Sequence, residues 1–261
     1  MTNRASGGLS LVEIEGARVE GADGPLASSL TLKITGPRAV VVGNAAPLVG
    51  PLFGLARVAS GRFHVLGAHL DDARDVAFAP LDPPLPIDLT PVEYVTWSAR
   101  LGGLSPKDAR RAASDACERA GLGTFATRKI GRIPLVPRRL VVLAHAASTS
   151  PRLLVADSPL AGLDPDSARY VLGALGRLVA SRCAIVTTPR FDPGSPAEVL
   201  TKGADEVIVL AGERVLEQGA PSSIRTLWSV DESAPAAPTE SPSRESPSPG
   251  PDDAGPGDTG A

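Results

Sequence analysis

The chain has 261 residues, of which 43% are apolar, so it can bury one sizeable core or one core with a small lobe. Residues 231–261 carry seven acidic residues and one basic residue, a net charge of −6, whereas the whole chain carries −3 and residues 1–230 therefore about +3. Such a weak positive charge gives no electrostatic basis for binding nucleic acid. Cys117 and Cys183 stand too far apart for a metal or redox motif, which predicts reduced thiols and no metal site.

The two ends of the chain differ in character. The amino-terminal segment contains Glu13 and Glu15 and no apolar stretch of signal type, which predicts a cytoplasmic protein. Residues 39–56 form an uncharged run at the lower limit of a membrane span, but their prolines and glycines indicate a strand, a turn and a helix instead. Residues 231–261 lack aromatics and are rich in Pro, Ser, Gly and Ala, so we predict a disordered acidic tail there.

Three strands and a helix are predicted in the first 60 residues. Residues 9–14 and 30–34 alternate apolar and polar side chains as half-buried strands do. Residues 39–42 are continuously apolar, which is typical of a strand buried on both faces. Residues 51–59 are predicted to be helical.

The middle of the chain is predicted to be helical. Ser105 is a good N-cap, Pro106 suits the first helical position and Gly121 suits the end, so a helix is predicted over residues 106–120. A second helix is predicted over residues 138–147.

Strands and helices alternate again after residue 150. Residues 153–156 are predicted as a buried strand, Asp164 and Pro165 as the start of a long helix that ends near Ser181, residues 184–188 as a second buried strand and residues 206–218 as a hairpin. Apolar strands joined by helices indicate a parallel sheet covered on both faces.

The segment Leu153-Leu154-Val155-Ala156-Asp157-Ser158-Pro159-Leu160-Ala161-Gly162-Leu163-Asp164-Pro165 resembles the Walker B strand and D-loop of the ATP-binding cassette (ABC) family. Residues 60–67, 80–104 and 204–210 are similar to further parts of that family, and the resemblance covers about residues 9–225. It implies an α/β fold of the P-loop NTPase-like ABC ATPase type over residues 1–230, with a mainly parallel sheet core and a helical subdomain at about residues 88–150.

Residues 43–50 occupy the place of the family's phosphate-binding loop, G-x-x-x-x-G-K-[ST], in which the lysine neutralises phosphate and the hydroxyl ligates magnesium. Gly43 and Asn44 match the start of that loop. Val49 stands in the lysine position and Gly50 in the hydroxyl position, so the resemblance implies a nucleotide site that has lost both groups.

The remaining motif positions depart from the family as well. Asp157 matches the Walker B aspartate, whereas Ser158 stands where the family has the glutamate that polarises water, and a serine hydroxyl is no general base at neutral pH. Thr188 falls at the switch histidine. Other motif positions are also changed: Leu81 for the glutamine, Val19 for the adenine-stacking aromatic and residues 133–137 for the signature.

Two of the acidic residues have a structural interpretation beside the functional one. Asp157 is either a magnesium ligand or a partner of nearby backbone amides, and we favour the structural role because a metal site needs several converging oxygens. Asp164 serves as a helix N-cap and, by the resemblance, as a D-loop residue at a subunit interface.

Phosphoryl transfer depends on positioned charges that are each worth several powers of ten, so losing these groups together predicts no turnover. We therefore predict no catalytic residue, no cofactor, and a degenerate ABC subunit at the inner face of the membrane that contacts a permease or a second cassette subunit. The alternative is an active ATP-hydrolysing subunit with non-standard motifs, for which ATP and Mg²⁺ would be required. A third hypothesis is an apolar ligand at the loop, because Leu48, Val49 and Leu52 surround it.

Overall fold

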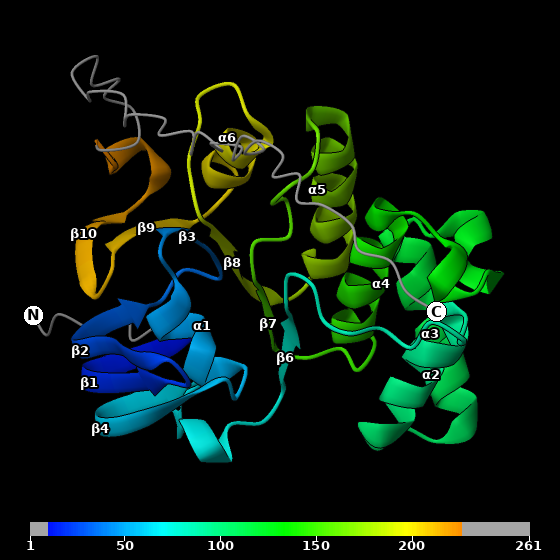
Figure 1. Ribbon diagram of the computed structural model, residues 1–261, viewed down its shortest axis with the longest axis horizontal. Helices are drawn as coiled ribbons and strands as arrows, with labels where there is room; N and C mark the ends of the chain where they lie inside the picture. The colour runs from blue at the N-terminus through cyan, green and yellow to red at the C-terminus, as the bar shows by residue number, and fades with distance from the viewer. Residues whose placement is uncertain (1–9, 226–261) are drawn as a thin grey trace, which may run out of the picture. The chain divides into compact units, whose positions relative to one another are not determined.

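Two β-sheets and a group of helices make up residues 10–225, the part of the chain that the computed structural model describes (Figure 1). The first sheet is antiparallel, in the order β2-β1-β4-β5, and the second has the order β10-β9-β3-β8-β7-β6. The strands are β1 (Val12–Gly21), β2 (Gly24–Ile34), β3 (Arg38–Gly43), β4 (Ala56–Val65), β5 (Ala68–His69), β6 (Val76–Ala79), β7 (Leu153–Ala156), β8 (Cys183–Thr188), β9 (Glu206–Ala211) and β10 (Arg214–Gly219).

The helices separate the strands of the second sheet. They are α1 (Ala46–Leu52), α2 (Pro91–Leu101), α3 (Pro106–Ala120), α4 (Leu135–Ala147), α5 (Pro165–Val179) and α6 (Pro196–Lys202), with short 3₁₀ turns at Leu70–Asp72, Gly123–Thr127, Ile130–Arg132 and Pro221–Ser223. No helix in residues 10–225 has both the length and the apolar character needed to span a bilayer.

The second sheet is parallel except for β10, which pairs antiparallel with β9. Its central strands β3, β7 and β8 are continuous apolar runs because both of their faces are buried. The predicted strands in residues 39–42, 153–156 and 184–188 are therefore confirmed, as is the α/β fold class. Parallel strands bring the residues that follow β3, β7 and β8 to one edge of the sheet.

The capping residues define α3 as the sequence predicts. Ser105 accepts a hydrogen bond from the Asp108 amide, Pro106 begins the helix, and Gly121 ends it in the left-handed region with φ of 78°. Asp164 caps α5 in the same manner, accepting from the amides of Asp166 and Ser167.

The helix predicted over residues 51–59 is wrong. The helix begins five residues earlier, at Ala46, because Pro47 suits a first turn, and Gly54 leaves the helical region with φ of 69°. Residues from Ala56 onward form β4, which pairs antiparallel with β1.

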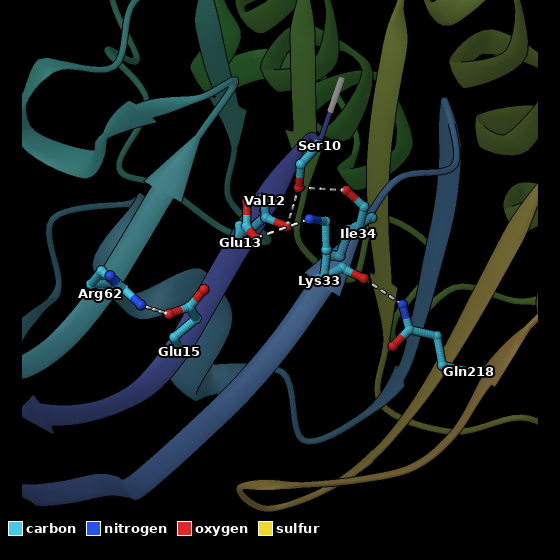
Figure 2. A network of polar contacts seen from close by, with 8 residues as sticks. All are labelled: Ser10, Val12, Glu13, Glu15, Lys33, Ile34, Arg62 and Gln218. Carbon is cyan, nitrogen blue, oxygen red and sulfur yellow. Dashed lines mark hydrogen bonds and ion pairs between the residues drawn. The ribbon is translucent and has the colours of Figure 1, made fainter. Parts of the chain in front are cut away.

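Polar contacts join the two sheets at one corner (Figure 2). Gln218 of β10 donates from Nε2 to the backbone carbonyl of Lys33 in β2 and, over 2.6 Å, to Glu206 Oε1 of β9. The other carboxylate oxygen of Glu206 accepts from the amides of Thr35 (2.8 Å) and Gly36 (2.6 Å), in the turn between β2 and β3. This corner fixes the start of β3 relative to the first sheet.

Helices α2, α3 and α4 pack around an alanine-rich core between residues 91 and 147. The proposed subdomain limits of about 88–150 remain a prediction. The predicted tail, residues 231–261, lies outside the described residues.

Candidate functional site

A cavity of about 390 Å³ opens where β3, β7 and β8 end. This is the edge at which parallel α/β sheets place their ligands. The residues that line it come from three loops: Gly43, Asn44, Ala45, Ala46, Val49, Asp157, Ser158, Thr187 and Pro189. The structure thus brings together five of the predicted site residues, Gly43, Asn44, Val49, Asp157 and Ser158.

The loop between β3 and α1 is short, since only Asn44 and Ala45 separate the strand from the helix. The Ala46 amide donates to Asn44 Oδ1 at 3.1 Å, and the amides of Leu48 and Val49 both donate to the Ala45 carbonyl at 2.9 Å. Pro47 has no N–H. Three backbone amides of this segment, those of residues 46, 48 and 49, are therefore engaged within the segment itself rather than directed at an anion.

Val49 and Gly50, which stand at the family's lysine and hydroxyl positions, face different parts of the structure. The Val49 side chain lies at the cavity wall and is 7% exposed. Gly50 does not line the cavity, because a Cβ there would point at β4, 3.0 Å from the Ala56 Cβ and 3.4 Å from Leu26 Cδ1. A hydroxyl at residue 50 would therefore begin from the side of the helix that faces the first sheet.

Gly43 has a steric reason to be glycine. Its φ is 107°, and a Cβ on this residue would stand 2.1 Å from the backbone oxygen of Leu210 in the neighbouring strand β9. No side chain fits at that distance, so the close approach of β3 to β9 requires glycine here irrespective of any ligand.

Asp157, Ser158 and Thr187 form one hydrogen-bonded cluster. Thr187 Oγ1 donates to Asp157 Oδ1 at 2.7 Å and accepts from the Ser158 amide at 2.9 Å, while Ser158 Oγ donates to the same Oδ1 at 3.0 Å. Ser158 adopts a left-handed conformation, with φ of 48°, which is unusual for a non-glycine residue. The cluster ties the end of β7 to the end of β8.

The polar side chains of this cavity are one carboxylate, two hydroxyls and the carboxamide of Asn44, and the rest of its wall is apolar or glycine. None of the residues that line it is a lysine, an arginine or a histidine, and the hydroxyls of Ser158 and Thr187 have no basic partner among them. In residues 10–225 no group of three His, Cys, Asp or Glu side chains is arranged to hold a metal ion. The residues present do not fit the lysine and hydroxyl pattern that holds Mg-nucleotide phosphates.

The other predicted positions lie outside the cavity. Thr188 turns away from it and donates from Oγ1 to the Arg190 carbonyl at 2.9 Å. Asp164 uses its carboxylate to cap α5, and hydrogen bonds from the Ser167 side chain and amide lower its pKa below the ordinary value. Leu81 accepts a hydrogen bond at its carbonyl from the buried guanidinium of Arg139 in α4.

Thr187 is the site residue that sequence reasoning missed. Counting along the family pattern selects Thr188, but successive side chains of a strand point to opposite faces, so only one of the two threonines can face the cavity. The register of β7 with β8 ends with Ala156 opposite Val186, so the next residues, Asp157 and Thr187, follow at the same level and are joined by their side-chain hydrogen bond. Alignment of the two apolar strands by their starting residues could have indicated this neighbour.

The fold and the site place the chain in a general structural class. It is an α/β domain with a mainly parallel sheet, and its cavity lies at the carboxyl edge beside a strand-to-helix loop, as in P-loop nucleoside triphosphatases. Solved structures agree in fold. The protein cbiO1 of Clostridium perfringens, part of the ABC transporter complex cbiONQ, matches with a TM-score of 0.68 at 19% identity, covering 82% of this chain and 89% of the other. The ADP conformation of an ATP-binding cassette of an ABC transporter matches with a TM-score of 0.64 at 15% identity, covering 81% and 91%.

Curated relatives agree in sequence. The phosphonates import ATP-binding protein PhnC 2 of Nostoc sp. is 26% identical over 70% of this chain and 79% of its own length. The molybdenum import ATP-binding protein ModC of Aromatoleum aromaticum is 32% identical over 64% of this chain and 46% of its own length. An uncharacterised ABC transporter ATP-binding protein of Bacillus subtilis, YxlF, is 28% identical over 52% and 46%.

In sequence the chain is similar to ABC transporter ATP-binding proteins and in fold to solved ABC cassettes, which confirms the resemblance. It spans about half the length of several of the curated relatives that it matches. No family profile matches the chain.

These relatives correct one prediction. The expectation of no cofactor is wrong, because the relatives are ATP-binding proteins by name. The prediction was based on the side chains missing from the motif positions, such as the lysine at Val49, the hydroxyl at Gly50 and the glutamate at Ser158. The sequence similarity to ATP-binding proteins makes ATP the first ligand to test on this chain.

Proposed function

We propose that the chain is an ABC-type subunit that does not hydrolyse ATP and that acts by contact with a membrane permease or a second cassette subunit. The observation that carries the proposal is the composition of the site cavity. Val49 stands where a lysine would stabilise the transferred phosphoryl group, and Ser158 stands where a glutamate would accept the proton of water.

The state of Asp157 supports the same proposal. Its Oδ1 already accepts two hydrogen bonds, from Thr187 and Ser158, so this carboxylate acts as a structural acceptor between two strands. Each missing charged group is worth orders of magnitude in rate, and no neighbouring side chain of the cavity replaces it.

Contact with a partner is supported by an exposed apolar pair on α2. Trp97 is 65% exposed and Leu101 is 83% exposed, and their spacing of four residues places both on one face of the helix. Charged residues would be expected at such positions on a helix that faces only water.

Phosphate release from Mg-ATP by the purified full chain tests the first half of the proposal. We expect no release above a protein-free blank, in the wild type and in Ser158→Glu alike, because a restored base has no positioned phosphate to act with. ATP binding is measured separately, by calorimetric titration, so that binding without turnover is recognised. Turnover in the wild type would refute the proposal and favour the alternative of an active subunit, which the kinship with ATP-binding proteins supports.

Membrane fractionation of cells that produce the full chain tests the second half. We expect the wild type to sediment partly with membranes and the double variant Trp97→Ser/Leu101→Ser to remain in the supernatant. Leu55→Ser is the matched control, since Leu55 is also 71% exposed but lies outside α2. Equal sedimentation of all three proteins would contradict a role for the α2 face.

A further inference from the structure

A second and larger cavity, of about 920 Å³, lies at the opposite edge of the parallel sheet, where β3 and β8 begin. We call it the α5–α6 cavity, because residues of these two helices line it together with residues of β3 and β8. Figure 1 shows where α5, α6 and β8 lie in the fold. Its volume falls within the range of small-molecule sites in proteins. None of the residues that line the site at the carboxyl edge takes part in it.

The walls of the α5–α6 cavity are mostly apolar. Val40 and Val186 contribute from the sheet, Leu175 and Val179 from α5, and Leu200 from α6. These side chains would shield an alkyl chain from water.

A glycine in the middle of α5 enlarges this space. Gly176 lines the cavity, and a Cβ built on it would meet no atom within 4 Å. Glycine in a helix interior lowers the stability of the helix relative to alanine. At residue 176 it leaves open space in the cavity that a larger side chain would fill.

Two arginines stand side by side at the rim. The Cys183 amide donates to the Arg152 carbonyl at 3.1 Å, which places Arg152 and Arg182 at the starts of adjacent strands. Within residues 10–225 neither forms an ion pair with a carboxylate, although Arg38 at the same rim is paired with Asp205 at 2.8 Å.

The surroundings of Arg182 favour an added negative charge. Its guanidinium donates to the Ala147 carbonyl at 3.1 Å, and burial together with the nearby Arg119 charge lowers its pKa. An anion at the rim would offset this repulsion between cations.

We propose that the α5–α6 cavity binds an amphipathic carboxylate of the fatty-acid class, with the alkyl chain between α5, α6 and the sheet and the carboxylate at Arg152 and Arg182. Apolar walls alone would accept any hydrophobic molecule, whereas the unpaired arginines select an anionic head group, which a guanidinium can hold through two hydrogen bonds. The site is separate from the nucleotide-type cavity, so its occupancy does not depend on whether ATP is hydrolysed.

Calorimetric titration of the full chain with dodecanoate, below its micelle concentration, tests the proposal. We expect saturable binding with one ligand per chain. Dodecanol and dodecylammonium have the same alkyl chain without the negative charge, and each is expected to bind at least tenfold more weakly. Absence of dodecanoate binding, or equal binding of the three molecules, would overturn the proposal.

Two glycines of α5 provide a matched pair of variants. Gly176→Leu directs a side chain into the cavity and is expected to weaken dodecanoate binding at least tenfold. Gly173→Leu is the control, because Gly173 lies outside the cavity and a Cβ there makes only an ordinary 3.6 Å contact with Arg177. Unchanged affinity in Gly176→Leu would place the ligand elsewhere and refute the assignment.

A rim variant covers the case in which Gly176→Leu fails to fold. The Arg152 side chain is exposed and forms no hydrogen bond within the described part of the chain, so Arg152→Gln should fold normally. We expect it to weaken dodecanoate binding about tenfold, equivalent to about 1.4 kcal/mol, and to leave dodecanol binding unchanged. An equal effect on both molecules would contradict the role of the charge.

Discussion

Replacement of Thr187 by valine tests whether Asp157 is a structural residue. The substitution keeps the branched shape but removes the hydroxyl that donates to Asp157 Oδ1 at 2.7 Å and accepts from the Ser158 amide at 2.9 Å. Thr187 is only 1% exposed, so water cannot replace these bonds readily.

The expected cost follows from the two bonds. A hydrogen bond to an ionised acceptor contributes about 1.5–3 kcal/mol, and a buried amide left without its acceptor adds a penalty of about 1 kcal/mol or more. We expect Thr187→Val to lower the free energy of unfolding by about 2–4 kcal/mol, and the Tm by about 5–15 °C for a domain of this size. Urea unfolding followed by circular dichroism measures the first, and scanning calorimetry the second.

Thr188→Val is the matched control, since Thr188 is the next residue of the same strand and is also buried, at 7% exposure. Its hydroxyl makes a single bond to the Arg190 carbonyl, so a loss of about 1 kcal/mol is expected. If Thr187→Val were no more destabilising than Thr188→Val, the cluster would not hold β7 to β8. The interpretation of Asp157 as a structural acceptor would then be wrong.

Three further outcomes are expected. Gly43→Ala should destabilise the fold severely, because its Cβ would lie 2.1 Å from the Leu210 oxygen, and loss of soluble full chain measures this. Burial lowers the pKa of His145 below its usual 6.5, so the unfolded chain binds more protons and stability should fall as pH drops below about 6.5; His145→Phe should show a smaller loss of Tm between pH 7.5 and pH 5.5. Burial raises the pKa of Cys117 to about 12, so in the native chain a thiol reagent at pH 8 should label Cys183 faster than Cys117, as peptide mapping can show. A native Cys117 that reacts at the rate of a free thiol, or a His145→Phe variant with unchanged pH dependence, would contradict these expectations.

The fold was predictable where local signals and burial agree. The helix that follows Ser105 has an N-cap, a first-turn proline and a terminal glycine, and both of its ends match the structure. The apolar runs that became β3, β7 and β8 needed no long-range information, because a strand buried on both faces is apolar throughout.

The candidate site was less predictable, because its geometry depends on where a helix begins. The prediction over residues 51–59 assigned residues of β4 to a helix, although tertiary pairing with β1 decides their conformation. For the same reason, matching positions along a motif could not reveal that Gly50 faces β4, or that Thr187 rather than Thr188 joins Asp157.

The placement of α1 leads to a last prediction, which concerns restoration of the motif. The triple variant Val49→Lys/Gly50→Ser/Ser158→Glu returns every charged or hydroxyl group that the loop and the strand end lack. We nevertheless expect no phosphate release from Mg-ATP above the blank, because side chains alone do not rebuild the loop. Residue 50 faces β4, and the amides of residues 46, 48 and 49 stay bonded within the loop.

The same variant with Pro47→Gly added is the informative comparison. This change restores an N–H and frees the backbone at the start of α1, where the proline favours the present helix. Turnover in the quadruple variant but not in the triple variant would locate the defect in the backbone of the loop. Turnover already in the triple variant would show that the missing side chains alone are responsible, and that the early start of α1 does not limit the chemistry.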